Sequence, residues 1–287
     1  MNSKQHILID RKRVVQAFSA YVANYNAEDE KILLKIKHTY RVAAISEQIA
    51  EAIGLDACDR DLAWLIGMLH DIGRFEQLRR FGTFIDADSI DHAHFGVELL
   101  FEDGLLGEFI EDGNQMAKCV SESDVVSETD ACRDDILVIK KAIWNHSSFR
   151  IEDGLSPREL LFAKLIRDAD KIDILKVATD TPLEELYNVT TEQIHAAPVT
   201  EKVMEQFRKE QTILRAVKKV PIDHRVGHIA LVFELEFSES YGLVKKQGYL
   251  EKLFDIRTTN PQIAGQFEEL KSIVKNFLHS KNNIEFG

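Results

Sequence analysis

Proline is absent from the first half of this 287-residue chain and first occurs at Pro157. Because proline breaks helix interiors, its absence leaves this half free to form long helices. Cysteine is also scarce: Cys58, Cys119 and Cys132 are too few and too unevenly spaced for a disulfide framework or a cysteine zinc site. These two shortages exclude a small disulfide-stapled fold and favour a helical one.

Long apolar runs and an excess of positive charge are missing as well. No segment approaches the roughly 18 apolar residues of a membrane helix, and the N-terminal run from Ile7 to Ile9 is too short for a signal peptide. Lys and Arg number 36 against 48 Asp and Glu, which gives a net charge of −12. A broad nucleic-acid surface needs clustered positive charge. We therefore expect a cytoplasmic protein with no membrane span and no such surface.

The spacing of apolar residues predicts a mainly α-helical fold. The expected helices cover residues 27–53, 59–72, 89–103, 133–146 and 156–177, with Asn26 as the first N-cap and Gly54, Gly73 and Gly104 closing the first three. The clearest start signal is the run from Ser156 to Glu159, in which an N-cap serine is followed by Pro157 and a glutamate that completes a capping box.

Two segments do not follow this pattern. Residues 102–135 carry eleven acidic residues against Lys118 and Arg133, a local net charge of −9, and we expect a solvated surface loop there, with a lid over a site as the alternative. Residues 225–237, RVGHIALVFELEF, fit the spacing of either a helix or a strand. The helical reading is favoured because the rest of the chain is helical.

Four histidines lie on the apolar faces of four different expected helices: His38, His70, His92 and His146. A single inward histidine is normally a core residue with a satisfied hydrogen bond. Burying four imidazoles toward a common interior is costly unless they share a partner, and a metal ion is the usual one. The joint pattern therefore favours a metal site.

The dipeptide His70-Asp71 strengthens this interpretation. Adjacent side chains in a helix diverge by about 100°, but near a helix end closed by Gly73 the two can flank the same site. A carboxylate has two oxygens, so Asp71 can bind one metal ion or bridge two.

The run GMLHDIGRF, residues 67–75, resembles the motif of the HD-domain superfamily of metal-dependent phosphohydrolases. Its members pair an early histidine with a His-Asp dipeptide and a later aspartate, and those with two metal ions add two histidines between. The resemblance spans residues 38 to about 175, and the metal ligands that it implies are His38, His70, Asp71, His92, His146 and Asp170. The Gly-Tyr-Pro motif of the cyclic-dinucleotide phosphodiesterases is missing, which argues against that subfamily.

Periodicity alone leaves the last aspartate open between Asp168 and Asp170. Each falls on an apolar stripe of the expected helix. The family's habit of an alanine before its last aspartate points to Asp170, and Asp168 is then a salt-bridge or supporting residue. His94 has no place in the family pattern, and we expect it to be exposed or to support a ligand.

The resemblance implies an all-α, HD-domain-like helical bundle around a metal site in residues 1–180. Residues 181–287 would form a helical extension that packs on the same core. Histidine and carboxylate ligands suit divalent Mn, Fe, Co, Ni or Zn, with Mg possible, and two ions are expected. Two dications would leave a net +2 centre after Asp71 and Asp170 contribute −2, which would attract a phosphate and activate water.

The implied activity is hydrolysis of a phosphate mono- or diester, with a nucleotide or another small phosphate ester as substrate. Asp71 and Arg74 are the expected catalytic residues, and Arg74, Arg79 and Lys171 are candidates for binding the substrate phosphate. Residues 74–80 hold three arginines against only Glu76, and for Arg79 and Arg80 a solvated loop is the favoured interpretation. Two other functions use the same residues: a di-iron oxygenase, and a non-catalytic nucleotide-sensing module.

Overall fold

The computed structural model describes residues 6–121, 131–181, 189–194 and 196–282. Helices and their connections make up this part of the chain, and no strand occurs in it, which confirms the all-α prediction. The chain divides into two compact units, Met1–Asp170 and Lys171–Gly287. Helix α9, Pro157–Asp180, contributes to both. None of the described helices combines the length and apolar character needed to cross a membrane.

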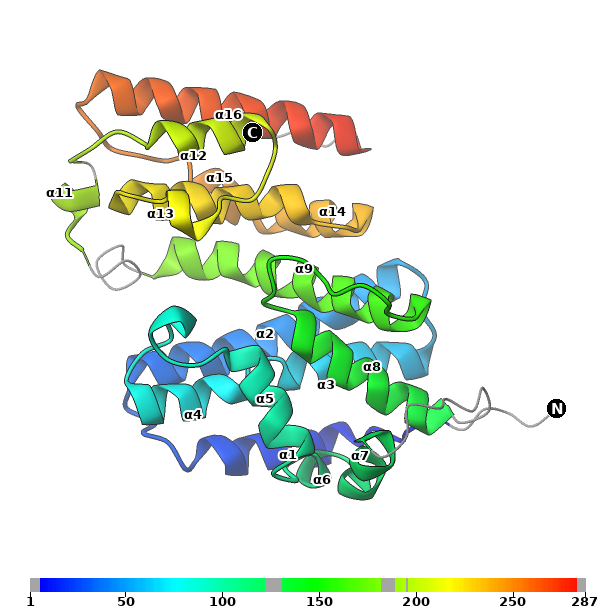
Figure 1. The fold of residues 1–287 in the computed structure, drawn as a ribbon. Coiled ribbons are helices and arrows are strands. Elements are labelled where there is room, and N and C mark those ends of the chain that lie inside the picture. The colour runs from blue at the N-terminus through cyan, green and yellow to red at the C-terminus, as the bar shows by residue number, and fades with distance from the viewer. Residues whose placement is uncertain (1–5, 122–130, 182–188, 195, 283–287) are drawn as a thin grey trace. The chain divides into compact units, whose positions relative to one another are not determined.

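The first unit, whose ribbon runs from blue to green in Figure 1, spans all the expected metal-binding residues. Its helices are α1 Arg11–Val22, α2 Glu30–Ala52, α3 Ala57–Leu69, α4 Ile72–Phe81, α5 His92–Phe101, α6 Leu106–Phe109, α7 Gly113–Ser121, α8 Ala131–Asn145 and the first part of α9, with a 3-10 turn at Asp86–Asp88. Helices α2 and α3 pack backbone to backbone, because a Cβ added to Gly67 would lie only 2.5 Å from the Cα of Ala43. Such close packing fixes the relative positions of the side chains on these two helices.

Helix α4 is the main departure from the predicted elements. The helix expected over residues 59–72 ends as α3 at Leu69, and residues 74–80, expected to be a loop, belong to α4. Gly73 does not close a helix. A Cβ there would lie 2.4 Å from the carbonyl oxygen of His92, so this glycine permits the close crossing of α4 and α5. Phe75 anchors α4 by packing its fully buried ring against Phe18 of α1.

The acidic segment 102–135 is also more ordered than predicted. Residues 106–109 and 113–121 are helical, so the expectation of one long loop is wrong for them. The physical reason is apolar burial, because Leu106 and Phe109 are almost fully buried. Arg13 of α1 also donates to the carbonyl oxygens of Gly107 and Glu108, at 2.6 and 3.0 Å. Residues 122–130, the centre of the predicted loop, lie outside the described residues.

Side-chain caps set the helix starts. The capping box at α9 is confirmed, since Ser156 N donates to Glu159 Oε2 at 2.7 Å and Glu159 N donates to Ser156 Oγ at 3.3 Å. Helix α2 begins three residues later than predicted, because Asp29 rather than Asn26 accepts from the first turn. Asp91 likewise caps α5 and starts it at His92 instead of residue 89.

The second unit continues from the end of α9. Its elements are α11 Thr191–Ile194, α12 Glu201–Arg208, a 3-10 turn Arg215–Val217, α13 Pro221–Ile229, a 3-10 turn Ala230–Glu234, α14 Ser238–Gln247, α15 Tyr249–Lys252 and α16 Pro261–Asn282. The ambiguous segment 225–237 is helical as far as Glu234, as predicted, and extended from Leu235. The expectation that this unit packs on the core of the first one stays a prediction.

Candidate metal centre

Breaks and ends of helices position most of the predicted ligands. His38 lies within α2, His70 and Asp71 occupy the break between α3 and α4, and His92 is the first residue of α5. His146 directly follows the end of α8. Asp170 lies on α9, and its side chain is 16% exposed, against 3% or less for the other five residues. The structure brings all six side chains into one buried cluster.

The first group of donors surrounds one oxygen of Asp71. His38 Nε2 lies 3.5 Å and His70 Nε2 3.6 Å from Asp71 Oδ2. The two imidazole nitrogens are 3.3 Å apart. Asp170 completes this group, with its Oδ1 3.1 Å from His38 Nε2 and 3.9 Å from His70 Nε2.

A second group surrounds the other oxygen of the same carboxylate. His92 Nε2 lies 3.3 Å and His146 Nε2 3.7 Å from Asp71 Oδ1. The two imidazole nitrogens are 3.0 Å apart. Asp71 therefore stands between two histidine pairs and presents a different oxygen to each.

The donor spacing and chemistry fit metal binding. Donors that share one ion at metal–ligand distances of 2.0–2.2 Å stand roughly 3 to 3.5 Å apart. Across both groups, the measured separations between donors run from 3.0 to 3.9 Å. Imidazole nitrogens with carboxylate oxygens suit first-row divalent ions. These buried His and Asp side chains could therefore bind divalent metal.

Hydrogen bonds at the outer ring nitrogens prepare three of the imidazoles as ligands. His70 Nδ1 donates to the carbonyl oxygen of Gly67, and His146 Nδ1 donates to that of Ile143, both at 2.7 Å. Each carbonyl belongs to the last turn of a helix, where it has no partner within the helix. His92 Nδ1 makes a 2.8 Å bond to a carboxylate. With the proton on Nδ1, the lone pair of Nε2 faces the centre, as metal ligation requires.

The charges of the cluster also match the ligand states that a metal needs. Burial alone would raise the pKa of Asp71, but the ammonium group of Lys35, with Nζ 2.6 Å from Oδ2, and the neighbouring imidazoles hold that pKa well below its usual value. The pKa of Asp170 is also lowered: burial opposes ionisation, but the hydrogen bond with His38 and the charge interactions with His38 and His70 together outweigh it. Burial lowers the pKa of His70 to about 3. Both carboxylates are thus ionised and His70 is neutral at pH 7.

Asp86, which was not among the predicted site residues, supports the second group. Its Oδ2 accepts the 2.8 Å bond from His92 Nδ1. Its Oδ1 accepts from Arg74 Nη1 at 2.7 Å and from Gln77 Nε2 at 2.9 Å. Burial opposes ionisation of Asp86, but the bond from His92, the charges of His92 and Arg74, and the bond from Gln77 together lower its pKa to about 2. Asp86 therefore holds the His92 ring in the orientation that turns Nε2 toward Asp71.

Arg74 is engaged within the protein. Besides Asp86, its Nη1 donates to Gln77 Oε1 at 2.9 Å and to the carbonyl oxygen of Phe84 at 2.6 Å. Its Nε lies 3.6 Å from Asp71 Oδ1, is buried and makes no hydrogen bond. Arg74 thus ties the α4 helix to the segment that carries Asp86.

The other basic residues that were considered for phosphate binding pair with acidic side chains. Arg79 and Arg80 project from α4, and both pair with Glu76, each at 2.5 Å. Lys171 is the first residue of the second unit, and its Nζ lies 2.9 Å from Glu234 Oε2. Asp168, the alternative to Asp170, is fully buried on α9.

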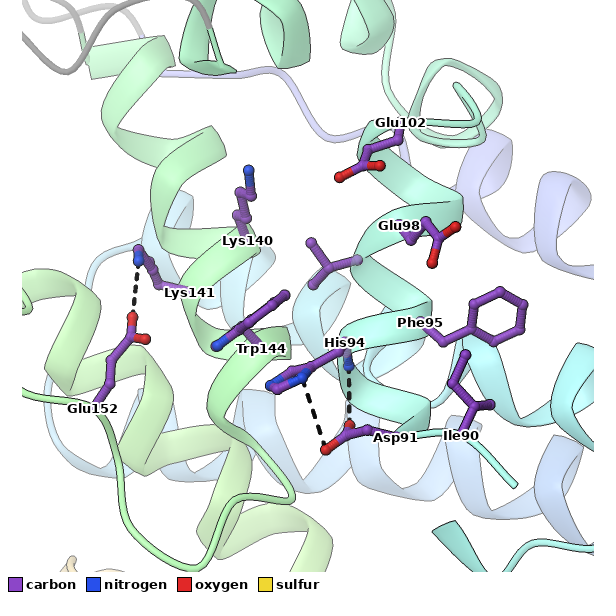
Figure 2. Close-up of a pocket in the computed structure, with 11 residues that line it drawn as sticks. Ile90, Asp91, His94, Phe95, Glu98, Glu102, Lys140, Lys141, Trp144 and Glu152 are labelled. Carbon is purple, nitrogen blue, oxygen red and sulfur yellow. Dashed lines mark hydrogen bonds and ion pairs between the residues drawn. The ribbon is translucent and has the colours of Figure 1, made fainter. Parts of the chain in front are cut away.

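His94 lies outside the metal cluster. It is two positions after His92 on α5, about 200° around the helix, and its ring stacks on Trp144 of α8 with centroids 3.6 Å apart. Figure 2 shows this pair in a cavity of about 590 Å³ between α5 and α8, which Lys140, Lys141 and Glu152 also line. His92 of the cluster and the side chains that line this cavity therefore lie on different faces of α5.

A further buried group that the sequence reasoning missed supports His146. Arg167 of α9 is 8% exposed and donates from Nη1 to the carbonyl oxygens of Asn145, at 3.0 Å, and of Ser148. These bonds close the last turn of α8, where helical carbonyls lack partners. The sequence feature that could have identified Arg167 is its position among apolar residues of the expected helix 156–177.

Comparison with known protein families agrees with this geometry. The family model described as HD domain matches residues 36–175, a range that contains both histidine groups and Asp170. No curated protein and no solved structure matches the chain significantly. The family match and the two buried groups of His and Asp side chains lead to the same conclusion. Residues 36–175 of this chain are an HD domain, the domain of a superfamily of metal-dependent phosphohydrolases.

Proposed function

We propose that this protein hydrolyses a phosphate mono- or diester at a centre of two divalent metal ions. The observation that carries the proposal is the position of Asp71, whose Oδ2 faces His38 and His70 while its Oδ1 faces His92 and His146. One carboxylate between two pairs of imidazoles is the arrangement that a bridging ligand requires.

Each side chain then has a definite task. His38, His70 and Asp170 would hold one ion, His92 and His146 the other, and Asp71 both. When bound, the ions would supply a water molecule of lowered pKa and neutralise charge on the phosphoryl group. Asp86 keeps the proton on His92 Nδ1, so that Nε2 stays available.

The charge of the centre supports a phosphate ester as the substrate. The two ligand carboxylates neutralise half of the charge of two divalent ions, so the centre would stay positive within a chain of net charge −12 and would attract a phosphate group. We propose a nucleotide or another small phosphate ester. Arg74 Nη1 already serves three acceptors, so a contact between Arg74 and the phosphate would use Nη2.

Metal content per chain, measured by elemental analysis of protein purified without chelator, is the first test. We expect a stoichiometry near two in the wild type and a clear loss in His70→Ala. His94→Ala is the matched control, because this histidine lies outside the cluster on the face that stacks with Trp144. The same three proteins are then assayed with a panel of phosphate mono- and diesters, where only His70→Ala should be inactive.

The two other functions give different results. An iron-loaded protein whose visible absorption changes with oxygen, and which leaves the whole ester panel intact, would indicate an oxygenase. Wild-type and His70→Ala proteins that bind nucleotide equally and hydrolyse nothing would indicate a sensing module. Absence of metal from the wild type, even after reconstitution, would contradict the proposal, because the imidazoles would then be core residues.

A further inference from the structure

A phenyl ring beside the candidate metal centre plays no part in the proposed function. Phe84 lies in the connection between α4 and α5, two residues before the turn at Asp86–Asp88. Its ring centroid is 5.7 Å from Lys35 Nζ and 5.8 Å from Arg74 Cζ. Lys35 Nζ is 2.6 Å from Asp71 Oδ2. The ring centroid is therefore no farther from this oxygen than 5.7 plus 2.6 Å, or 8.3 Å.

The side of Asp71 that carries these two cations is open to solvent. The side chains of Lys35 and Arg74 are 18% and 15% exposed, whereas that of Asp71 is 3% exposed. Phe84 is itself partly exposed. A molecule that approaches Asp71 along either cation therefore meets the phenyl ring.

Hydrogen bonds from Arg74 fix the backbone that carries this ring. Arg74 Nη1 donates to the carbonyl oxygen of Phe84 at 2.6 Å and to Asp86 Oδ1 at 2.7 Å. Arg74 belongs to the first turn of α4, so these bonds tie Phe84 to the helix that begins directly after Asp71. The position of the ring is therefore set before any substrate binds, as is required of a residue that selects among substrates.

The ring differs in chemistry from the other groups around Asp71. Lys35, Arg74 and the imidazole and carboxylate side chains of the centre are polar or charged, so they suit the phosphate of an ester and not its organic part. Two aromatic rings that pack with their centroids 4.5–7 Å apart gain affinity beyond that of the apolar area they bury. Phe84 is therefore suited to recognise a planar ring in the organic part of the ester.

We propose that Phe84 selects phosphate esters whose organic part carries a planar ring, and that this ring packs against Phe84 while the phosphate lies at the metal centre. The inference rests on the proposed function, because that function places the phosphate beside Asp71. A nucleobase and a simple aryl group share the chemistry that Phe84 recognises. Phe84 does not reach the reacting atoms, so it is a specificity residue and not a catalytic one.

Isothermal titration calorimetry with phosphonates tests the proposal on the full-length, metal-reconstituted protein. Phenylphosphonate and methylphosphonate carry the same charged group, differ in the ring, and contain no ester bond, so binding is measured without turnover. The wild type should prefer phenylphosphonate. Phe84→Ala should reduce this preference about two- to tenfold and leave the affinity for methylphosphonate nearly unchanged.

Further variants separate ring recognition from general effects. Phe84→Tyr keeps the ring and should keep the preference. Phe81→Ala is the matched control, because Phe81 is an exposed phenylalanine at the end of α4, and it too should keep the preference. Metal content is measured for each protein. If Phe84→Ala folds poorly or loses metal, Phe84→Leu replaces it, since leucine keeps apolar volume without a ring.

A nucleoside 5′-phosphonate in place of phenylphosphonate distinguishes the two sources of a planar ring. Tighter binding of the nucleoside compound, lost in Phe84→Ala, would identify a nucleobase as the recognised group. Tighter binding of phenylphosphonate, lost in the same variant, would identify a simple aryl group.

Three results would overturn the inference while leaving the proposed function intact, provided that the metal-loaded protein hydrolyses phosphate esters. The first is a wild type that binds phenylphosphonate and methylphosphonate equally. The second is an unchanged preference in metal-loaded Phe84→Ala. The third is equal weakening of both phosphonates, which would show that Phe84 acts only through Lys35 and Arg74. A protein that neither holds metal nor hydrolyses any ester would instead refute the proposed function, and this inference with it.

Discussion

Substitution of Asp86 by asparagine should impair one half of the metal centre and spare the other. Asp86 Oδ2 accepts from His92 Nδ1 at 2.8 Å, while Oδ1 accepts from Arg74 and Gln77. An asparagine would present one NH₂ group to these donors in either amide orientation. If the NH₂ group faces His92, the imidazole must move its proton to Nε2, which then cannot bind metal.

The size of this effect follows from the role of the carboxylate. Loss of a hydrogen bond that supports a metal-binding histidine typically costs 10- to 100-fold in metal affinity, which is about 1.4 to 2.7 kcal/mol. The loss should concern the ion held by His92 and His146. The ion near His38, His70 and Asp170 should be retained, so the stoichiometry at limiting metal should fall from about two to about one.

Competition with a chromophoric chelator measures the affinities for the two ions. Hydrolysis of the phosphate mono- and diester panel is assayed in parallel. Asp88→Asn is the matched control, because Asp88 lies in the same 3-10 turn with an exposed side chain. The reasoning would be refuted if Asp86→Asn bound both ions as tightly as Asp88→Asn. Equal weakening of both ions would also contradict it, because Asp86 touches only the second group.

Three further predictions concern other parts of the protein. Lys35→Met removes the ammonium group 2.6 Å from Asp71 Oδ2. The buried carboxylate then has no cation beside it in metal-free protein, so the melting temperature should fall, whereas metal affinity should rise because no ammonium group competes with the ion for Asp71. A fall in both quantities would contradict this. Gly73→Ala should cost about 1–3 kcal/mol in chemical unfolding because its Cβ meets backbone, whereas Gly96→Ala, with no neighbour nearer than 3.4 Å, should cost less. The pKa of His228, lowered to about 3, means that the unfolded chain binds an extra proton between about pH 6.5 and 3. The free energy of unfolding should therefore decrease by up to about 1.4 kcal/mol for each unit by which the pH is lowered through this range. His228→Gln should make this decrease shallower. An unchanged slope would show that the pKa of this imidazole is not lowered in the folded protein.

The sequence predicted the cluster of His and Asp side chains better than it predicted the helices around it. Apolar spacing alone placed His38 and His146 on inward faces, because that spacing reports which side of a helix is buried. The predicted helix end at Gly73 lay close to the break at His70-Asp71, but apolar spacing did not show that a new helix begins at Ile72. Gly73 lies in the first turn of this helix, where an added Cβ would come within 2.4 Å of the carbonyl oxygen of His92.

Residues that support the ligands were the hardest to predict. Asp86 lies in a short connecting turn with no periodic pattern, and its role depends on a contact with His92 that only the tertiary structure creates. Lys35 did have a signal, since it precedes His38 by three positions and so shares its helix face. Periodicity could not choose between Asp168 and Asp170, since both are on apolar stripes; the resemblance pointed to Asp170, whose Oδ1 lies 3.1 Å from His38 Nε2 in the structure.

The placement of ligands at helix ends has a kinetic consequence. His70 caps α3 and His146 follows α8, and the Nδ1 of each is tied to a carbonyl of the last helical turn. Helix ends open by fraying at a much smaller free-energy cost than global unfolding. Metal release should therefore follow the fraying of these turns, and its rate should track the hydrogen exchange of their amides while the remainder of the domain stays folded. The Arg167 bonds to the carbonyl oxygens of Asn145 and Ser148 would then lengthen the residence time of the ion bound by His146.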